Sequence, residues 1–398
     1  MSKIITSSIW SADDVPDGLT FDKDLGVFSG TPNVPVGEYV VPVSVSTNYG
    51  SNAKDITILV EEKPIPAKVF AIGEEAERWS SGATPDSYGF RELSIPLCST
   101  LTTLPSGFAA KSIAGEWYIA CANEKCTALY SEYDLDFYSS PKIYPVESIS
   151  KISGGIRNFS NNGSSVTRAF FVYMKNNNEV HVCRASYSST KFKYVFNFKE
   201  VLYDIKDFQK CCCRGLALIN QSDEIVVYSD DFIIKPEKNL KHVVMWSSGG
   251  DGIVYFITKY GELFSVEGTK KPVQDSTTTE KILNIWTAYQ YNNTFFVTEN
   301  NNVYARGENN KYNLGLPVAK FYHDFSLVGN YNVKKIEGNF MLTRDGKLFH
   351  TGESINGITN SHETFTHIFP EYKFYDIAYL DVIGNFSIAS KTLVAIKE

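Results

Sequence analysis

Short apolar segments alternate with polar turns along most of the chain, and the clearest example lies at residues 281–315. There the segments ILNIW, TFFVT and VYARG are separated by TAYQYNN and ENNN. Apolar and β-branched runs of this length, bounded by Asn and Gly, are typical of antiparallel strands joined by tight turns. No long stretch repeats its apolar residues every 3.6 positions, so the pattern predicts an almost purely β protein.

Weaker copies of this unit lie before and after it and indicate a repeat. Their starts fall at residues 108, 149, 203, 240, 281, 332 and 374. Successive starts lie between 37 residues (203 to 240) and 54 residues (149 to 203) apart. A period of roughly 40 to 50 residues with several strands per unit is typical of a β-propeller. We therefore predict a propeller over residues 69–398 with seven blades, while insertions in the longer units leave six or eight open.

The best copies carry a recognisable motif. It comprises Val303, Tyr304, Gly307, Asn309, Leu314 and Gly315, together with the turn residues Asp345 and Gly346 of the next copy. These residues resemble the repeat of the regulator-of-chromosome-condensation family, although Arg306 stands where that repeat has Trp. The resemblance implies a propeller of that type, a fold that sometimes serves in exchange factors for small GTPases. The segment VFAIGEE from Val69 looks like the last strand of a repeat, so we expect it to pair with the C-terminal blade and close the ring.

Residues 1–62 have a different pattern. Val41, Val43 and Val45 alternate with polar residues or proline, which predicts a strand with one apolar face. Because proline donates no hydrogen bond, Pro42 predicts that this strand lies at a sheet edge or carries a bulge. Residues 63–68, KPIPAK, contain two prolines and are expected to form an extended linker.

The N-terminal segment also carries a motif. Its residues are Pro16, Gly18, Leu19, Phe21, Gly30, Thr31, Pro32, Gly37 and Tyr39. They resemble the putative-immunoglobulin family of cadherin-like sandwiches, which occurs in many bacterial and phage surface proteins. Leu25-Gly26 replaces the usual Thr-Gly, a mild departure. The resemblance implies an Ig-like β-sandwich that acts as a spacer or docking module, and the turn glycines agree with it because they suit a positive φ.

Composition narrows the possible partners. The net charge is −7 and no basic stripe is present, which disfavours binding to nucleic acid through its phosphates. The N-terminus MSKIITSSIWSADD lacks the apolar region of a secretory signal, so we expect synthesis in the cytoplasm of the producing cell. The sequence has no run of about 18 apolar residues, so we expect no membrane span.

The sequence contains no recognisable catalytic, metal-binding or cofactor-binding motif, so we expect no cofactor and no enzymatic activity. The seven cysteines, three of them at 211–213, are expected to be small buried side chains. His350 is expected to be solvated or hydrogen-bonded, the carboxylates Asp134 and Asp136 are expected on a solvated strand face or loop, and the Gly-rich segment 247–252 is expected to form a hairpin turn. Four tryptophans are candidate contact residues: Trp79, Trp117, Trp246 and Trp286. For Trp246 and Trp286, which occupy similar positions in adjacent units, we favour the alternative of internal packing.

Three hypotheses for function follow. The first is a non-enzymatic structural or recognition protein of a virion, such as a phage head decoration, fibre or tail adhesin. In it the Ig-like module docks to other virion proteins, the propeller loops bind a host-surface protein or carbohydrate, and homo-oligomers are possible. The second is an intracellular interaction scaffold or small-GTPase regulator. The third is a propeller lyase or glycan hydrolase, which would need carboxylates or histidines clustered at one face of the ring.

Overall fold

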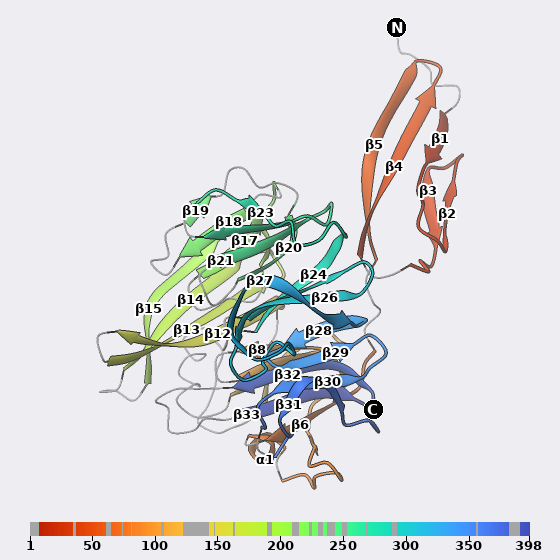
Figure 1. The fold of residues 1–398 in the computed structure, drawn as a ribbon. Coiled ribbons are helices and arrows are strands. Elements are labelled where there is room, and N and C mark those ends of the chain that lie inside the picture. The colour runs from red at the N-terminus through yellow and green to blue at the C-terminus, as the bar shows by residue number, and fades with distance from the viewer. Residues whose placement is uncertain are drawn as a thin grey trace. The chain divides into compact units, whose positions relative to one another are not determined.

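The computed structural model divides the chain into two compact units, Met1–Pro64 and Ile65–Glu398, and each is described by itself. The structure describes residues 8–34, 37–60, 65–73, 75–80, 82–104, 107–121, 143–146, 148–161, 164–188, 193–208, 215–222, 225–229, 234–236, 243–248, 253–267, 270–288, 293–355, 357–381 and 391–398. Strands dominate both units (Figure 1), which confirms the predicted all-β class. No helix in these ranges is long and apolar enough to span a membrane.

The first unit is a small sandwich of two sheets. Its strands are β1 (Ser8–Ala12), β2 (Leu19–Asp22), β3 (Val27–Gly30), β4 (Gly37–Thr47) and β5 (Gly50–Val60). One sheet has the order β1-β4-β5 and the other is the hairpin β2-β3. The predicted alternation holds in β4, because Val41 and Val43 are buried whereas Pro42 is exposed.

The prediction that the strand of Pro42 lies at an edge or carries a bulge was wrong. Strand β4 is the central strand of its sheet, and its described pairing with β5 is continuous through Pro42↔Asp55. The strand tolerates proline because the last β1–β4 pair is Ala12↔Val43, so β1 ends one position before Pro42. Beyond the end of β1, Asp13 N donates to Pro42 O (3.1 Å). No residue of β1 lies opposite Pro42, so the ladder does not require an N–H group there.

The second unit contains seven four-stranded antiparallel sheets among its described residues. Six of them follow the chain in order. They are β8 (Cys98–Leu104), β9 (Gly107–Ser112), β10 (Trp117–Cys121) and β11 (Ile143–Val146); β12 (Ile149–Asn161), β13 (Ser164–Lys175), β14 (Val180–Ser188) and β15 (Lys193–Leu202); β16 (Ile205–Phe208), β17 (Gly215–Asn220), β18 (Ile225–Ser229) and β19 (Ile234–Pro236); β20 (Val243–Ser248), β21 (Ile253–Thr258), β22 (Leu263–Glu267) and β23 (Val273–Gln274); β24 (Ile282–Ala288), β25 (Asn293–Thr298), β26 (Asn302–Asn309) and β27 (Ala319–Asn330); β28 (Val333–Glu337), β29 (Phe340–Thr343), β30 (Leu348–Gly352) and β31 (His362–Ile368).

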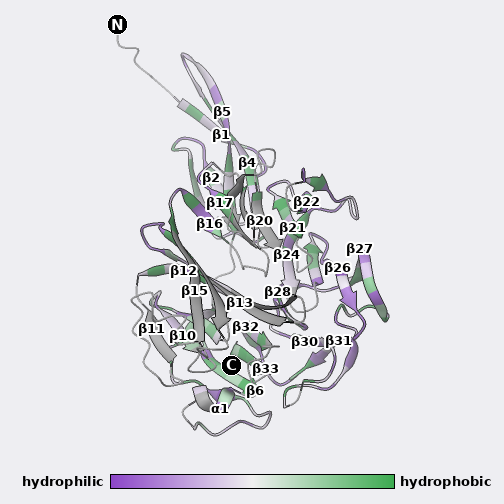
Figure 2. Ribbon diagram, turned by 90° about the vertical axis from the view of Figure 1, so that its left-hand side faces the viewer, coloured by the Kyte–Doolittle hydropathy of each residue, from purple (hydrophilic) through white to green (hydrophobic). Residues whose placement is uncertain are grey.

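The remaining sheet joins the two ends of this unit. Its order is β32 (Phe374–Asp381), β33 (Lys391–Lys397), β6 (Lys68–Gly73) and β7 (Arg91–Glu92). The register runs from Thr392↔Gly73 to Lys397↔Lys68, and both inner strands are hydrophobic in Figure 2. The predicted pairing of the segment from Val69 with the C-terminal blade is thereby confirmed. The short helix α1 (Ala76–Trp79) follows β6.

The sheets follow one another around a ring. First strands of neighbouring sheets contact each other at β8–β12, β20–β24, β24–β28 and β28–β32, and β32 of the joining sheet contacts β8. Hydrophobic clusters fill the spaces between successive sheets; one contains Phe340, Leu342 and Leu348 with Ile377 and Leu393. Strands β25 and β29 are buried at every described position, which explains why apolar runs such as TFFVT do not alternate.

The first repeat begins earlier than the sequence analysis places it. Residue 108 lies in β9, the second strand of its sheet, and the first strand is Cys98–Leu104. This strand reads CSTLTTL, so its few apolar residues do not form the continuous run that marks the other units. The other six predicted starts lie within three residues of a first strand.

One side of the ring is tied together by a repeating pair of backbone hydrogen bonds. In the β29–β30 turn, Arg344 N donates to Asn332 O (2.9 Å) at the start of its own sheet. The same turn accepts a hydrogen bond from the next sheet, because Phe374 N donates to Gly346 O (2.9 Å). The β29–β30 turn therefore anchors the first strand of its own sheet and of the sheet that follows.

At the joining sheet the chain ends take the place of this turn. Glu398 N donates to Lys373 O (3.1 Å) in the same sheet, and Cys98 N donates to Ala67 O (3.0 Å) toward the next one. The joining sheet thus makes the same two contacts as a sheet with an uninterrupted chain.

Gly346, which the sequence analysis singles out with Asp345, stands at a close approach between sheets. Its φ is +88°, and a Cβ there would lie 2.5 Å from Lys373 Cγ and 3.1 Å from Phe374 O. Gly115 occupies the corresponding turn of the β8–β11 sheet with the same φ of +88°, but a Cβ there meets nothing within 4 Å. Both glycines have a positive φ, which favours glycine. Only at Gly346 would a side chain also collide with the next sheet.

This difference predicts the outcome of a matched pair of substitutions. We expect Gly115→Ala to lower the free energy of unfolding by about 1–2 kcal/mol through backbone strain alone. Gly346→Ala should lower it by roughly 1–3 kcal/mol more, because the new methyl group pushes against the next sheet. Urea denaturation of both variants measures the difference, and equal losses would contradict the close-approach argument.

Candidate functional site

Each first strand of the ring carries a bulge near its start. In all seven sheets the described pairing between first and second strands shifts register there, which leaves one extra residue on the first strand. The residues that resume pairing after the bulge are Thr100, Lys151, Asp207, Met245, Asn284, Lys335 and Asp376. The repeat therefore places an equivalent position on the first strand of every sheet.

Charged side chains at this position link neighbouring sheets. Lys151 on β12 pairs with Asp207 on β16 at 2.5 Å, and Lys335 on β28 pairs with Asp376 on β32 at 2.9 Å. The first pair is partly exposed, whereas the side chains of the second pair are only 20% and 10% exposed. The second pair is the strongest candidate for a site because its charges are held away from water.

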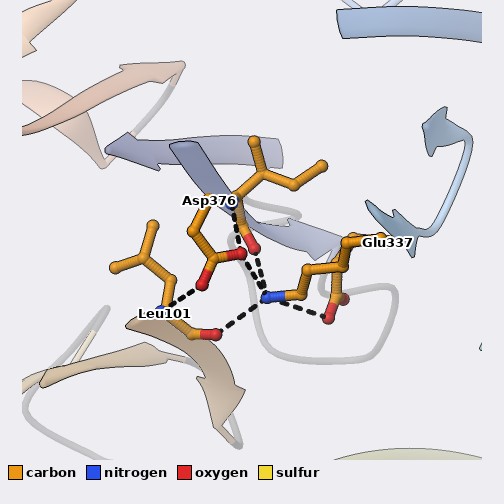
Figure 3. A network of polar contacts seen from close by, with 5 residues as sticks. Leu101, Glu337 and Asp376 are labelled. Atoms are coloured by element: carbon orange, nitrogen blue, oxygen red, sulfur yellow. Dashed lines mark hydrogen bonds and ion pairs between the residues drawn. The ribbon is translucent and has the colours of Figure 1, made fainter. Parts of the chain in front are cut away.

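Lys335 joins three sheets (Figure 3). Its Nζ donates to Asp376 Oδ1 (2.9 Å) and Ile377 O (2.7 Å) on β32, and to Leu101 O (2.8 Å) on β8. Asp376 Oδ2 accepts a hydrogen bond from Leu101 N at 2.6 Å. Glu337 Oε1 lies 3.9 Å from the ammonium. One lysine thus fastens β28, β32 and β8.

The electrostatics of this cluster favour a structural role. Burial by itself would lower the pKa of Lys335, but the charges of Asp376 and Glu337 outweigh it and hold the pKa above its ordinary value. The lysine therefore stays protonated at neutral pH and cannot act as a base. An ammonium has three donors, and Asp376, Ile377 and Leu101 accept all of them. No donor remains to bind a substrate.

The motif residues of the β24–β27 sheet come together in a folded loop. Asn309 is fully buried; its Oδ1 accepts from Leu314 N (2.9 Å) and its Nδ2 donates to Leu316 O (2.9 Å). A Cβ on Gly315 would lie 2.7 Å from the ring of Phe365 on β31. The loop therefore packs on the next sheet, while Val303 is buried in the same interface and Tyr304 stacks on Phe296 (4.9 Å). Gly307 has a φ of +128°.

Arg306, at the position where the resembled repeat has Trp, packs against two aromatic rings. Its guanidinium carbon lies 5.6 Å from the ring centroid of Tyr255 on β21 and 5.8 Å from that of Phe325 on β27. A planar cation can stack on aromatic faces much as an indole does. Arg306 therefore makes a contact between two sheets.

Asp345 caps its own turn. It accepts a hydrogen bond from Thr343 Oγ1 (2.5 Å) and pairs with Lys347 (2.6 Å), and these contacts lower its pKa. Its exposed position and local partners mark it as a turn-stabilising residue.

In the first unit the motif residues form the turns around β2 and β3. A Cβ on Gly18 would lie 2.2 Å from Thr31 O, and one on Gly30 would lie 2.3 Å from Gly18 O. Leu19 N donates to the backbone oxygen of the buried Pro16 (3.0 Å). The ring centroids of Phe21 and Phe28 lie 4.7 Å apart. The remaining motif residues lie beside these turns or on β4: Pro32 follows Thr31, Gly37 pairs with Val60, and Tyr39 pairs with Ile58. All of them serve the fold.

The prediction of a contact role was wrong for two of the four tryptophans. Trp79 and Trp117 are only 2% and 4% exposed, so neither is available to a partner. Trp286 is half-buried against the cluster between the β24 and β28 sheets. The side chain of Trp246 lies outside the described residues, as do Asp134, Asp136, the three cysteines at 211–213 and residues 249–252. Cys98 is buried, which raises the pKa of its thiol to about 12.

His350 is not solvated or hydrogen-bonded as expected. It is fully buried on β30, with its ring 5.0 Å from Phe340 and 5.6 Å from His362. Neither ring nitrogen has a hydrogen-bond partner among the described residues. Burial, reinforced by the charges of His362 and Lys391, lowers the pKa of His350 to about 3.

The ion pair of Lys335 with Asp376, called the clamp below, was not predicted from the sequence, although a signal was present. When the first strands ISKI, IKDF, VKKI and FYDI are aligned, Lys or Asp occupies the third position in each. Lys151 and Lys335 each stand one sheet before an Asp at that position. Alternating charges at one repeat position indicate ion pairs between neighbouring units.

Comparisons with known proteins support the two-part architecture. Residues 3–61 match the family model described as "Putative Ig domain". The match agrees with the glycine-turn geometry of the first unit and covers only that part of the chain. No curated protein matches the chain.

Most of the chain is similar in fold to a yeast propeller. Yeast RCC1 (Prp20), in a structure bound to Kap60, aligns with a TM-score of 0.56 and 10% identity over 84% of this chain and 89% of that chain. Prp20p from Saccharomyces cerevisiae, reported with its binding properties to Gsp1p and histones, aligns with a TM-score of 0.55 and 12% identity over 83% and 91%. At this identity the similarity shows the fold alone, which is an RCC1-like β-propeller.

The clamp predicts a large effect of a single substitution. Lys335→Met should lower the free energy of unfolding by about 3–5 kcal/mol, because it removes the ammonium that pairs with the buried Asp376. The matched control is Lys311→Met, which breaks an exposed pair with Glu353 (2.8 Å) and should cost about 0–1 kcal/mol. Chemical denaturation compares the two, and similar losses would refute the clamp.

The buried histidine predicts acid sensitivity. Below pH 6.5 the unfolded chain binds a proton at residue 350 that the folded chain does not, so stability falls as the pH drops toward about 3. One such proton contributes a slope of up to about 1.4 kcal/mol per pH unit. His350→Phe should remove this part of the slope between pH 6.5 and 4.5, whereas the exposed His323→Phe should keep it. Urea titrations at several pH values decide; an unchanged slope in His350→Phe would disprove the assignment.

Proposed function

We propose that this protein is a non-enzymatic structural and recognition protein of a virus particle, made in the host cytoplasm. The Ig-like unit docks to another particle protein, and the propeller displays a binding surface as a head decoration, fibre or tail adhesin does. Each of the seven sheets of the second unit forms one blade. The observation that carries this proposal is that the buried pair of Lys335 and Asp376 holds three sheets of the ring together.

The Lys335 cluster supports a scaffold over an enzyme. Its ammonium donates to Asp376, Ile377 and Leu101, and Asp376 accepts from Leu101 in return. A catalytic group needs a free donor, acceptor or proton directed at a substrate. Here those capacities are spent on joining three sheets, so the inner ring supplies rigidity to loops that do the binding.

One rim of the ring offers a contact surface. Ile113, Tyr203 and Tyr260 are 63%, 67% and 59% exposed and lie in turns at that rim. The backbone bonds Ile113 N to Leu97 O and Ile282 N to Gly261 O show that the turns and the strand starts meet on one side. Exposed aromatic and aliphatic side chains on a rigid frame suit a protein or carbohydrate ligand.

A second candidate is an intracellular scaffold or small-GTPase regulator. The similarity to yeast Prp20, which was reported with its binding to Gsp1p and histones, favours it. At 12% identity the shared feature is the fold. The Ig-like unit at residues 3–61 favours the particle protein, because docking modules of this kind suit an assembled surface.

Particle association is the direct test. In particles purified by density gradient from cells that produce this chain, mass spectrometry should find it at a fixed ratio to the major particle protein through high-salt washes. Tyr203→Ala combined with Tyr260→Ala should leave this ratio unchanged and weaken binding of the particles to host cells several-fold. A chain that stays in the soluble fraction, or that binds a small GTPase according to its nucleotide, would favour the second candidate.

A further inference from the structure

An aromatic cage surrounds the ammonium of Lys397, the last residue of β33. Its Nζ lies 3.6 Å from the ring centroid of Tyr372, 4.1 Å from that of Phe70 and 5.1 Å from that of Phe90. Asp86 Oδ2 pairs with it at 3.2 Å. The lysine side chain is only 3% exposed, so a full positive charge is held by three ring faces and one carboxylate.

The walls of the cage do not depend on the strand that supplies the lysine. Phe70 lies on β6, Asp86 and Phe90 lie between α1 and β7, and Tyr372 precedes β32. Phe90 makes edge-to-face contacts with Phe369 (5.1 Å) and Tyr372 (5.9 Å), which fix the ring orientations. The lysine on β33 is thus a guest in a site built by other segments.

Asp86 is positioned in advance by its own loop. Its Oδ1 accepts hydrogen bonds from Tyr88 N and Phe90 N, each at 3.0 Å. Burial would raise the pKa of Asp86, but hydrogen bonds from Tyr372, Lys397 and this backbone lower it overall. The carboxylate therefore stays charged and points its second oxygen, Oδ2, at the ammonium.

We propose that the joining sheet contains an alkylammonium-binding site, whose ligand in the intact chain is the side chain of Lys397. Aromatic faces around a cation attract it through their quadrupoles, and attraction is strongest when water is excluded. The carboxylate adds a charge-assisted hydrogen bond that selects an ammonium with at least one N–H. The ligand class is a primary ammonium on a slim unbranched alkyl chain.

Binding of this ligand fastens the ring. Lys397 ends the β33–β6 ladder, where it pairs with Lys68, and the cage holds that end against segments from the start of the unit. Asp86 and Phe70 precede Lys397 by 311 and 327 residues (397 − 86 and 397 − 70). The site thus connects the two ends of the second unit through a side chain as well as through backbone pairing.

Chemical rescue tests the proposal on the full chain. Lys397→Ala should lower the Tm by about 4 °C or more, because the cage loses its cation. Ethylammonium or propylammonium chloride at roughly 100 mM should restore about half of that loss, because a ligand that binds only the folded state raises its stability. Sodium chloride at the same ionic strength should restore nothing.

Matched variants separate the cage from general effects. In Lys397→Ala combined with Asp86→Asn the rescue should disappear, since asparagine keeps the Oδ1 acceptor for the loop and removes the charge at Oδ2. In Lys397→Met the thioether fills the cage, so added alkylammonium should not raise the Tm. Lys68→Ala, which removes a surface lysine of the same sheet, should neither lose several degrees nor respond.

Two results would overturn the site. One is a Lys397→Ala chain as stable as the wild type. The other is an equal response to alkylammonium in the wild type, Lys397→Ala and the double variant. If Lys397→Ala fails to fold, refolding is carried out with propylammonium or sodium chloride. Folded protein recovered only with propylammonium supports the cage, and equal recovery in both salts refutes it.

Discussion

A ring of sheets is stable only if its last member meets its first, and in this chain that meeting is the backbone pairing of β33 with β6. Without it, β33 and β6 would each present an unpaired hydrophobic edge. With it, the hydrophobic clusters on both sides of the joining sheet are complete, one shared with β8 and β9 and the other with β29 and β30. The remaining sheets need only follow one another between these fixed ends.

Polar contacts give the ring its register. Hydrophobic burial is not directional, so it can hold two sheets face to face without fixing how far one slides along the other. The bulge that begins each first strand, the turn that bonds to two sheets, and the Lys335 cluster all act at defined atoms. In the closing region Lys335 reaches between sheets and Lys397 reaches across the joining sheet, and each has a carboxylate partner on another segment.

The sequence was sufficient for features that depend on local pattern. Apolar runs such as TFFVT gave the strands buried on both faces, and the segment from Val69 gave the closing strand. The Gly-rich turns gave the Ig-like unit, which residues 3–61 also match as a family. The first and the last of these inferences rest on residues whose neighbours in the chain determine their conformation, whereas the closing strand was found because its sequence looks like the last strand of a repeat.

Features that depend on distant partners were not predictable. Trp79 and Trp117 are candidate contact residues in the sequence, but segments elsewhere in the fold bury both side chains. Pro42 is tolerated in a central strand because a separate strand, β1, ends beside it. The strand Cys98–Leu104 was overlooked because its threonines and serine weaken the apolar run. The partners of Lys335 and Lys397 lie on other sheets or at the other end of the unit, and no single-chain pattern names them.

The joining sheet also sets a timetable for biosynthesis. Strand β6 ends at Gly73, and its partner β33 ends at Lys397. Translation at about 5–20 residues per second separates the two by roughly 15 to 65 s. Throughout that interval β6 can pair with β7 but not with β33, so one of its edges stays open. That open β edge makes this strand a natural point for chaperone protection or for exchange between copies.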